Sequence, residues 1–437
     1  MKKLSISRRH ALKTALFGPG YIGLQSLATG IPISALMNGI PNTAHALEDS
    51  RPQYLILTSR SAGDPINANA PGTYVDGVVH NPSQDLAATN FFLGDQRVRA
   101  ARPWSTLPQR ALDQTTFIHH RTYQNVHAQH DNVMGLLGNA RGPTGTGTEV
   151  ITSLYSSETA GMLGTIQQEP IALAENALTF EGRALQSVQP QTLATLFTPE
   201  TGVGLQLQRR RQISLDRINA ELRTNGTPTQ RRWLDRYASS QDQIESLDES
   251  LLGVFSGLSN NNERSQIQAA IALIQMQVAP VIQIGIDFGG DNHRDGGLTE
   301  EATKTISGMA SLTAMFEQLR AVGLQDRVTV ANLNVFGRTL REKGTRGRNH
   351  NLNHHVMMVS GANVNPGVIG SVARSGNDFG ATAINSTTGA GGGNADIPAN
   401  QTLEAATKTL GCALGISADR MNTRINRGKI IRAALKS

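Results

Sequence analysis

The sequence predicts an α/β protein in which a mainly parallel sheet is flanked by helices. Three observations predict this class: short apolar runs typical of strands buried on both faces, amphipathic segments between them, and polar residues where the runs end. After the run at 281–286 come Asp287, Asp291, His293 and Asp295. Open α/β sheets bind ligands beyond the carboxyl ends of their strands, so this segment is a candidate site. The alternative is an acidic surface turn before a helix that starts at Thr299.

Further strands are expected at 54–59, 115–120, 328–334 and 355–360. Helices are expected at 127–137, 152–163, 299–323 and 403–414, followed by a basic helix from Asp419. Residues 203–258 are strongly helical and are interrupted by Asn-Gly-Thr-Pro at 225–228. This segment is predicted to be a helical hairpin inserted in the main domain, 47–437.

Residues 1–46 are predicted to be an export signal rather than part of the fold. Ser-Arg-Arg-His-Ala-Leu-Lys at 7–13 resembles the twin-arginine signal, and Ala-His-Ala at 44–46 fits a signal peptidase site. A permanent membrane anchor is the alternative, which the glycines and prolines of the apolar region disfavour. The mature chain is therefore expected in the periplasm or outside the cell, with no stable membrane span.

The charge of the mature chain gives little support to nucleic-acid binding. The whole chain has a formal charge of +6, but five of its Lys and Arg residues and none of its acids lie in residues 1–46. The remaining chain is thus close to neutral, at about +1, and no nucleic-acid partner is expected. The single cysteine, Cys412, excludes an intramolecular disulfide.

Histidines are gathered rather than scattered along the mature chain. Nine remain after the signal, and eight of them lie in three groups: His119, His120, His127 and His130; His293; and His350, His354 and His355. Imidazole together with carboxylate is a ligand set for zinc and similar divalent ions. Structural hydrogen bonding is the alternative for any one histidine, whereas the whole set favours a metal or acid–base site.

A series of motifs carries a family resemblance. Asp-Phe-Gly-Gly-Asp-Asn-His at 287–293 is followed by Asn-Val-Phe-Gly-Arg-Thr at 334–339, Gly-Arg-Asn-His at 347–350 with His354-His355, and the apolar segment 410–416. This order resembles the secreted domain-of-unknown-function family 1501, which is related to the alkaline phosphatase and sulfatase superfamily. The resemblance implies an alkaline phosphatase-like fold and a bound divalent ion, with zinc the expected metal.

The resemblance also implies which residues form the site. Arg338 would hold an anionic oxygen as a catalytic residue, and the metal ligands would be Asp64, Asp291, His293, His350 and His354 or His355. Two positions depart from the family pattern, because Val335 replaces a Glu and Asn349 replaces an Asp. Asp131, Asp287 or Asp295 could compensate in space. Thr58, Ser59, Ser61 and Thr122 are candidate nucleophiles.

Two functions follow from these residues. The first is an exported, hydrolase-like protein with one metal ion that cleaves a phosphate or sulfate ester in a small anionic substrate. The alternative is a catalytically degenerate family member that acts as a binding or assembly protein with other cell-envelope proteins. The two missing carboxylates leave both hypotheses open.

Overall fold

The computed structural model describes residues 53–436, except for 130–132, 135–149, 165–167, 175–177, 181–182, 197–202, 247–252, 256 and 342–346. The predicted export signal, His130 and Asp131 lie outside the described residues. The described chain forms two compact units. Unit 1 contains residues 156–180 and 184–282, and unit 2 contains residues 53–155 and 283–436, with 183.

The central sheet confirms the predicted α/β class. Its strand order is β13-β4-β12-β9-β1-β8-β5, and the boundary between the units falls within β8. Strand β1 is parallel to β9, and β13 is parallel to β4, whereas β12 is antiparallel to both β4 and β9. The strands are β1 (Tyr54–Thr58), β4 (Thr115–His120), β5 (Ile171–Ala172), β8 (Val281–Ile284), β9 (Val328–Asn332), β12 (His355–Ser360) and β13 (Gly367–Ile369).

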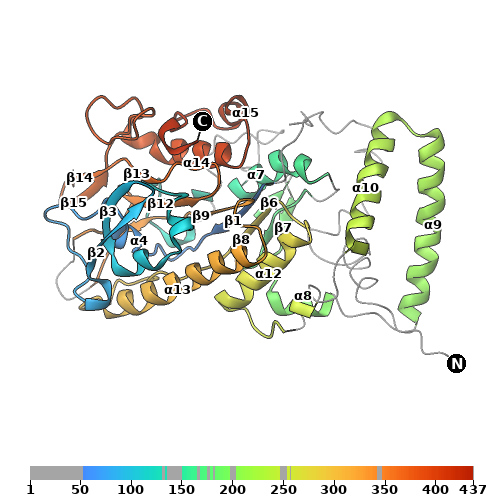
Figure 1. Cartoon of the computed structure of the whole chain (residues 1–437), viewed down its shortest axis with the longest axis horizontal. Coiled ribbons are helices and arrows are strands. Elements are labelled where there is room, and N and C mark those ends of the chain that lie inside the picture. The colour runs from blue at the N-terminus through green and yellow to red at the C-terminus, as the bar shows by residue number, and fades with distance from the viewer. Residues whose placement is uncertain are drawn as a thin grey trace. The chain divides into compact units, whose positions relative to one another are not determined.

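Helices cover both faces of the strands in unit 2. Figure 1 shows α13 (Thr299–Ala321) and α14 (Thr402–Ala413) on opposite sides of these strands. Each helix buries an apolar stripe, with Leu312 and Leu319 from α13 and Leu410 from α14. Every residue of β1, β4, β9 and β12 is buried, as expected for strands that are covered on both faces.

Unit 1 contains α8 (Pro190–Leu196), the long helices α9 (Val203–Asn225) and α10 (Pro228–Ser246), and α12 (Glu263–Gln275). Helix α10 begins at a capping box: the Thr227 hydroxyl accepts from the Gln230 backbone N–H at 3.3 Å, and the Gln230 side chain accepts from the Thr227 N–H at 2.7 Å. Pro228 follows at the first helical position, where no N–H is needed. The Asn-Gly-Thr-Pro break therefore separates two helices as the sequence indicated.

The expected helix over 127–137 differs in the part that the structure describes. Residues His127–Gln129 form a 3₁₀ turn instead, and most of the remaining segment lies outside the described residues. The turn presents the His127 ring to a site described below. Among the described residues, no helix has both the length and the apolarity needed to cross a bilayer.

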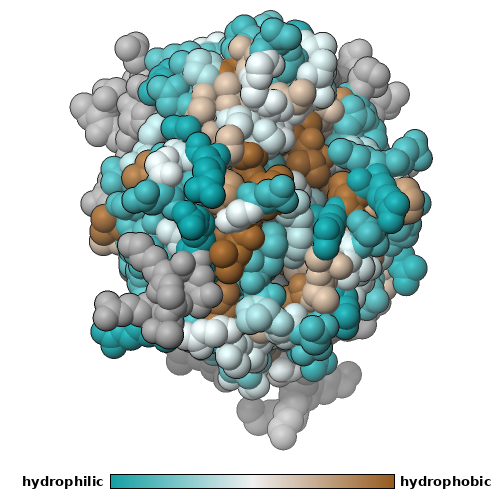
Figure 2. Space-filling view, turned by 90° about the vertical axis from the view of Figure 1, so that its left-hand side faces the viewer, coloured by the Kyte–Doolittle hydropathy of each residue, from teal (hydrophilic) through white to brown (hydrophobic). Residues whose placement is uncertain are grey.

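Exposed apolar side chains are spread over the surface of unit 2. Phe92 is 51% exposed, and Val75 and Val79 are exposed at 41% and 37%. Figure 2 shows one face on which apolar patches lie among polar residues. Exposed apolar residues of this kind are ordinary and need no partner to explain them.

Four histidines are buried in β4 and β12 and at the residue just before β12. His120 pairs with His355 across the ladder, and His119 and His354 lie next to them in sequence. All four side chains are fully buried. Burial lowers the pKa of His119 and of His120 from 6.5 to about 4, and it also holds the pKa values of His354 and His355 well below their ordinary value. The four rings are therefore uncharged at neutral pH.

We expect these histidines to make the fold sensitive to acid. Their pKa values are lower in the folded than in the unfolded chain, so the folded protein binds fewer protons, and stability falls as the pH drops below about 6.5 toward 4. Each histidine contributes a slope of roughly 1.4 kcal/mol per pH unit in that window. Urea unfolding at pH 7, 6 and 5 measures it. His120→Asn should lessen the slope by one such increment, and an unchanged free energy of unfolding between pH 7 and 5 would contradict the prediction.

Candidate metal centre

Four side chains of unit 2 form a group that could hold a metal ion. His127, Asp291, His293 and His350 each direct one ligand atom so that all four atoms lie within 4.8 Å of one another. His127 opens the turn after β4, and Asp291 and His293 lie in the loop after β8. His350 begins β11 (His350–Asn351), which pairs with β10 (Gly337–Arg338). Three segments far apart in sequence therefore meet at one point.

The three imidazoles are oriented by bonds from their outer nitrogens. Nδ1 of His127 lies 2.7 Å from the Ser61 carbonyl oxygen, and Nδ1 of His293 lies 3.3 Å from Oδ1 of Asn349. Nδ1 of His350 contacts the Asn125 carbonyl oxygen. Each of these oxygens accepts a hydrogen bond, so each Nδ1 is the donor. A neutral ring that donates from Nδ1 leaves a lone pair on Nε2.

The Nε2 atoms are the ones that converge. Nε2 of His293 is 2.7 Å from Nε2 of His350, and Nε2 of both His127 and His293 is 3.5 Å from a carboxylate oxygen of Asp291. Two lone pairs facing each other at 2.7 Å repel unless a cation lies near both. Metal-bound histidines commonly donate their other N–H to a carbonyl or carboxylate, as all three rings do here. The donor set and its outer bonds therefore fit a bound metal ion.

The charge state of the group also suits a cation. Burial, together with the nearby Arg338, His293 and His127, lowers the pKa of His350 from 6.5 to about 4. Partial burial alone would raise the pKa of Asp291, but Arg338, His127 and His293 together bring it below its usual value. An uncharged imidazole and an ionised carboxylate are the forms that bind metals. The Asp291 side chain is 52% exposed, so the group is open to solvent.

Arg338 is buried and holds the Asp291 carboxylate. Its side chain is fully shielded, and Nη2 donates to Oδ1 of Asp291 at 2.9 Å. Nε donates to the Gly63 carbonyl and Nη2 also donates to the Ala62 carbonyl. Nη1 is shielded from solvent and has no hydrogen-bond partner among the described residues. These contacts direct Arg338 toward the carboxylate of a candidate metal ligand rather than toward solvent.

Four consecutive residues of the loop after β1 accept hydrogen bonds from the site and from the loop that carries Asp291. The carbonyls of Ser61, Ala62 and Gly63 accept from His127 and Arg338, and Oδ1 of Asp64 accepts from the Gly290 N–H at 2.8 Å. Asp64 is fully buried. Burial and the neighbouring Asp287 raise its pKa to about 6. Asp64, predicted as a ligand, instead binds the backbone of the loop that carries Asp291 and is not one of the four clustered residues.

His354 and His355, also predicted as ligands, lie in the core rather than in the group. Nε2 of His354 is 2.8 Å from Nδ1 of His119, and the His355 ring is 5.4 Å from the His120 ring. Both side chains are fully buried, His355 at the start of β12 and His354 just before it, so neither is among the four clustered residues. The fourth residue of the group is instead His127, which the sequence did not single out as a ligand.

The two departures from the family pattern have different structural outcomes. Val335 is fully buried, so it lies in the core. Asn349 contacts His293 and, through its backbone, Thr339: the Asn349 N–H donates to the Thr339 hydroxyl at 3.1 Å. Asn349 therefore orients a candidate ligand.

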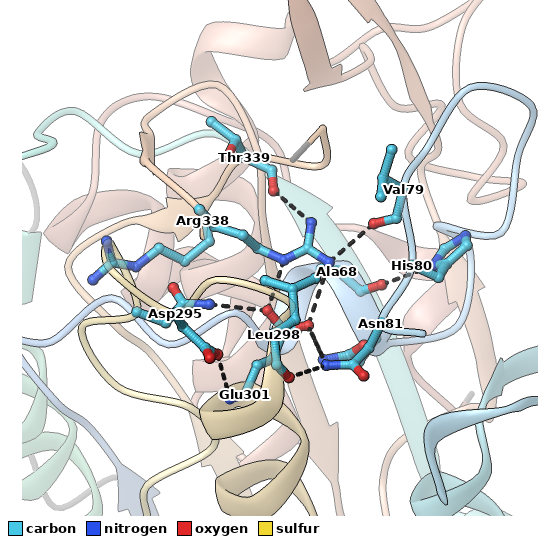
Figure 3. A network of polar contacts seen from close by, with 12 residues as sticks. Ala68, Val79, His80, Asn81, Asp295, Leu298, Glu301, Arg338 and Thr339 are labelled. Atoms are coloured by element: carbon cyan, nitrogen blue, oxygen red, sulfur yellow. Dashed lines mark hydrogen bonds and ion pairs between the residues drawn. The ribbon is translucent and has the colours of Figure 1, made fainter. Parts of the chain in front are cut away.

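A buried ion pair joins the two segments that supply Asp291, His293 and His350. Nε of Arg348 lies 2.7 Å from Oε2 of Glu301, and both side chains are fully shielded. Figure 3 shows Glu301 within the surrounding network of polar contacts. Asn292 donates to the same carboxylate oxygen at 2.9 Å, and Asn69 and Asn81 donate to the other. Arg348 also donates to the carbonyls of Val79 and Thr339, each at 2.9 Å. The residues just after Asp291 and just before Asn349 are thus held by one charged pair.

The glycine before Arg348 lets the two segments approach each other. Gly347 has a φ of +73°, and a side chain there would meet the backbone carbonyl of Asn292. The Arg348 N–H donates to that same carbonyl at 3.3 Å. Only glycine adopts this conformation readily and leaves room for such a contact.

The segment that carries three of the four clustered residues resembles a known family. The family model described as "Protein of unknown function (DUF1501)" matches residues 179–387. The DUF1501 match includes Asp291, His293, Arg338 and His350, whereas His127 and Asp64 lie outside it. It confirms the family resemblance over somewhat less than half of the chain. No curated protein matches the chain.

Asn349→Leu should weaken metal binding. The leucine cannot accept from Nδ1 of His293, and loss of such an outer bond typically costs ten- to a hundredfold in affinity. Asn349→Asp keeps an acceptor at this position, so it should bind zinc at least as tightly as the native protein. Competition with a chromophoric chelator measures the zinc dissociation constant. Equal affinities for the leucine variant and the native protein would show that Asn349 does not orient a ligand.

Glu301→Gln should destabilise unit 2. The change leaves the Arg348 charge buried without its partner, which costs about 3–5 kcal/mol. The exposed pair Arg110 and Asp326, joined at 2.7 Å, provides a matched control, because removing one partner of such a pair changes stability by at most about 1 kcal/mol. Urea unfolding of Glu301→Gln and Asp326→Asn compares the two. Similar losses in both variants would exclude a dominant role for the buried pair.

Proposed function

We propose that this protein is an exported, metal-dependent hydrolase that cleaves a phosphate or sulfate ester. The observation that carries the proposal is the convergence of three Nε2 lone pairs on the Asp291 carboxylate, with every Nδ1 engaged by an oxygen. His127, Asp291, His293 and His350 would hold one divalent ion. The related superfamily suggested by the motifs, and the twin-arginine pattern at 7–13, support the substrate class and the export route.

The ligand set favours zinc or a similar transition ion over magnesium or calcium. Magnesium and calcium prefer oxygen ligands, and calcium takes six to eight of them. Three imidazoles and one carboxylate instead suit zinc, cobalt, nickel or iron. When bound, such an ion supplies Lewis-acid chemistry and makes a water molecule a better nucleophile near neutral pH.

The charge of the group favours an anionic substrate. With the imidazoles neutral, a divalent ion contributes +2, Asp291 contributes −1 and the buried Arg338 contributes +1, which gives about +2 in total. Asp291 is half exposed and His127 and His293 are each exposed by more than a third, so a substrate can approach from solvent. A phosphate or sulfate ester provides the negative oxygens that such a site attracts.

The attacking group is expected to be water or the Ser61 hydroxyl. Among the candidate nucleophiles, Thr58, Ser59 and Thr122 are buried, and the Thr122 hydroxyl donates to the carbonyls of Gln124 and Leu352. Ser61 is exposed, and its carbonyl accepts from the His127 ring. His127 therefore lies beside the one candidate hydroxyl that solvent reaches.

Activity should depend on one metal ion held by these residues. Protein stripped with a chelator should regain hydrolysis of an aryl phosphate or an aryl sulfate on addition of about one equivalent of zinc. Loss of a ligand removes several kcal/mol of transition-state stabilisation, so His293→Ala should lower kcat/KM by at least about a hundredfold. The surface variant Asp326→Asn should keep both metal and activity. Ser61→Ala separates the two nucleophiles, since only the serine route loses activity with metal binding intact.

A binding or assembly protein of the cell envelope is the second candidate. It is favoured by the group's single carboxylate among the described residues, because a two-metal hydrolase is expected to have more. Zinc that binds at one equivalent with neither ester hydrolysed would favour this candidate. Less than about half an equivalent of zinc, unchanged in a His293→Ala/His350→Ala variant, would overturn the proposed metal centre itself.

A further inference from the structure

We infer that Asn67 is a positioning residue for the metal centre, acting through Arg338. Asn67 lies in the short helix α4 (Ile66–Asn69) and is fully buried. It contacts none of the four candidate ligands by a hydrogen bond that the structure describes. The inference rests on the proposed metal centre and concerns how the Asp291 carboxylate is held in place.

The Asn67 side chain binds the Arg338 backbone on both sides. The Arg338 N–H donates to Oδ1 of Asn67 at 3.0 Å, and Nδ2 of Asn67 donates to the Arg338 carbonyl at 2.7 Å. Arg338 is paired with His350 across β10 and β11, and its guanidinium holds Asp291 at 2.9 Å. The Asn67 amide thus fixes Arg338, which contacts two of the candidate ligands, Asp291 and His350.

A chain of neutral histidines determines which way this amide faces. Nε2 of His119 lies 3.1 Å from the Pro71 carbonyl, so Nε2 carries the proton and Nδ1 is an acceptor. Nε2 of His354, at 2.8 Å, must then be the donor to His119, which leaves Nδ1 of His354 as an acceptor. The atom of Asn67 facing that Nδ1 at 3.3 Å is therefore the donor Nδ2. Oδ1 is left to accept from Arg338.

The assignment gives every nitrogen in the chain a defined role. The hydrogen bonds run from Asn67 to His354, from His354 to His119, and from His119 to Pro71. A neutral, fully bonded chain of this kind is stable in a dry interior, whereas a half-satisfied one is not. Burial, which lowers the pKa of both histidines, maintains the neutral form that the chain needs.

Close packing at Gly337 shows that this contact tolerates little movement. A side chain at Gly337 would meet the backbone carbonyl of His354 and the amide of Asn67. Strand β10 therefore lies directly against Asn67 and the start of β12. We therefore expect that removal of the Asn67 amide shifts the Arg338 backbone, because the tight packing leaves little room for other groups to adjust.

The test compares Asn67→Asp with a matched asparagine away from the site. An aspartate at position 67 cannot donate to the Arg338 carbonyl or to Nδ1 of His354. Zinc affinity should fall about tenfold or more, the effect expected when an outer contact of a metal site is lost. The absorption spectrum of the cobalt-loaded protein should shift as well, because it reports the geometry of the ligands. The chelator competition is run on the full chain at a temperature at which each variant is folded.

Asn365→Asp is the control. Nδ2 of Asn365 donates to the carbonyls of Ala433 and Leu435, so this amide also ties backbone segments together, but its bonding partners lie in the C-terminal segment. The control should lose stability while its zinc affinity and cobalt spectrum stay as in the native protein. Asn67→Ser, which is smaller and uncharged, replaces Asn67→Asp if the latter does not fold.

The outcomes separate this inference from the proposed function. Native-like zinc affinity and cobalt spectrum in a folded Asn67 variant would overturn the positioning role and leave the metal centre intact. A tenfold loss in both the Asn67 and Asn365 variants would also overturn it, because the effect would then be one of general stability. If the native protein binds no zinc, the metal centre and the positioning role fall together.

Discussion

The buried ion pair between Glu301 and Arg348 is the constraint on which the site depends. Two charges with no exposure to water are stable only when each is fully paired and hydrogen-bonded, so their geometry tolerates few alternatives. Glu301 lies in the first turn of α13, and Asp295 fixes that turn by accepting from the backbone of Glu300 and Glu301. The loop after β8 and the segment after β10 therefore meet at a defined distance. The arrangement of the four candidate ligands is a consequence of this meeting.

The candidate ligands are held by contacts that differ in kind. Each imidazole is aimed by a single oxygen, two from backbone carbonyls and one from Asn349, whereas Asp291 is held by a buried guanidinium. Backbone oxygens cannot be removed by a side-chain substitution, so His127 and His350 have orientations that are robust to sequence change. The orientations of His293 and Asp291 depend on side chains, which makes them the sensitive points of the site.

The sequence predicted the parts of the fold and site that follow from local pattern. Apolar runs located β1, β4, β8, β9 and β12. The polar residues after β8 indicated Asp291 and His293, and a motif indicated His350; the structure places all three in the candidate cluster. The predicted ligands Asp64, His354 and His355 lie outside the cluster because their side chains are fully buried, which their positions along the chain did not reveal. The sequence did not predict the ion pair between Glu301 and Arg348. Glu301 was visible only as part of a helix start, and Arg348 only as a basic residue in a motif.

The positions of the four clustered residues in the sequence have a consequence for the stability of the fold. They come from positions as far apart as His127 and His350, in a chain whose single cysteine permits no intramolecular disulfide. An ion bound by them would tie together segments more than 200 residues apart, and a ligand at a hundred times its dissociation constant adds about 2.7 kcal/mol to folding. The metal would then act as a reversible cross-link, formed where the ion is available and released where it is scarce.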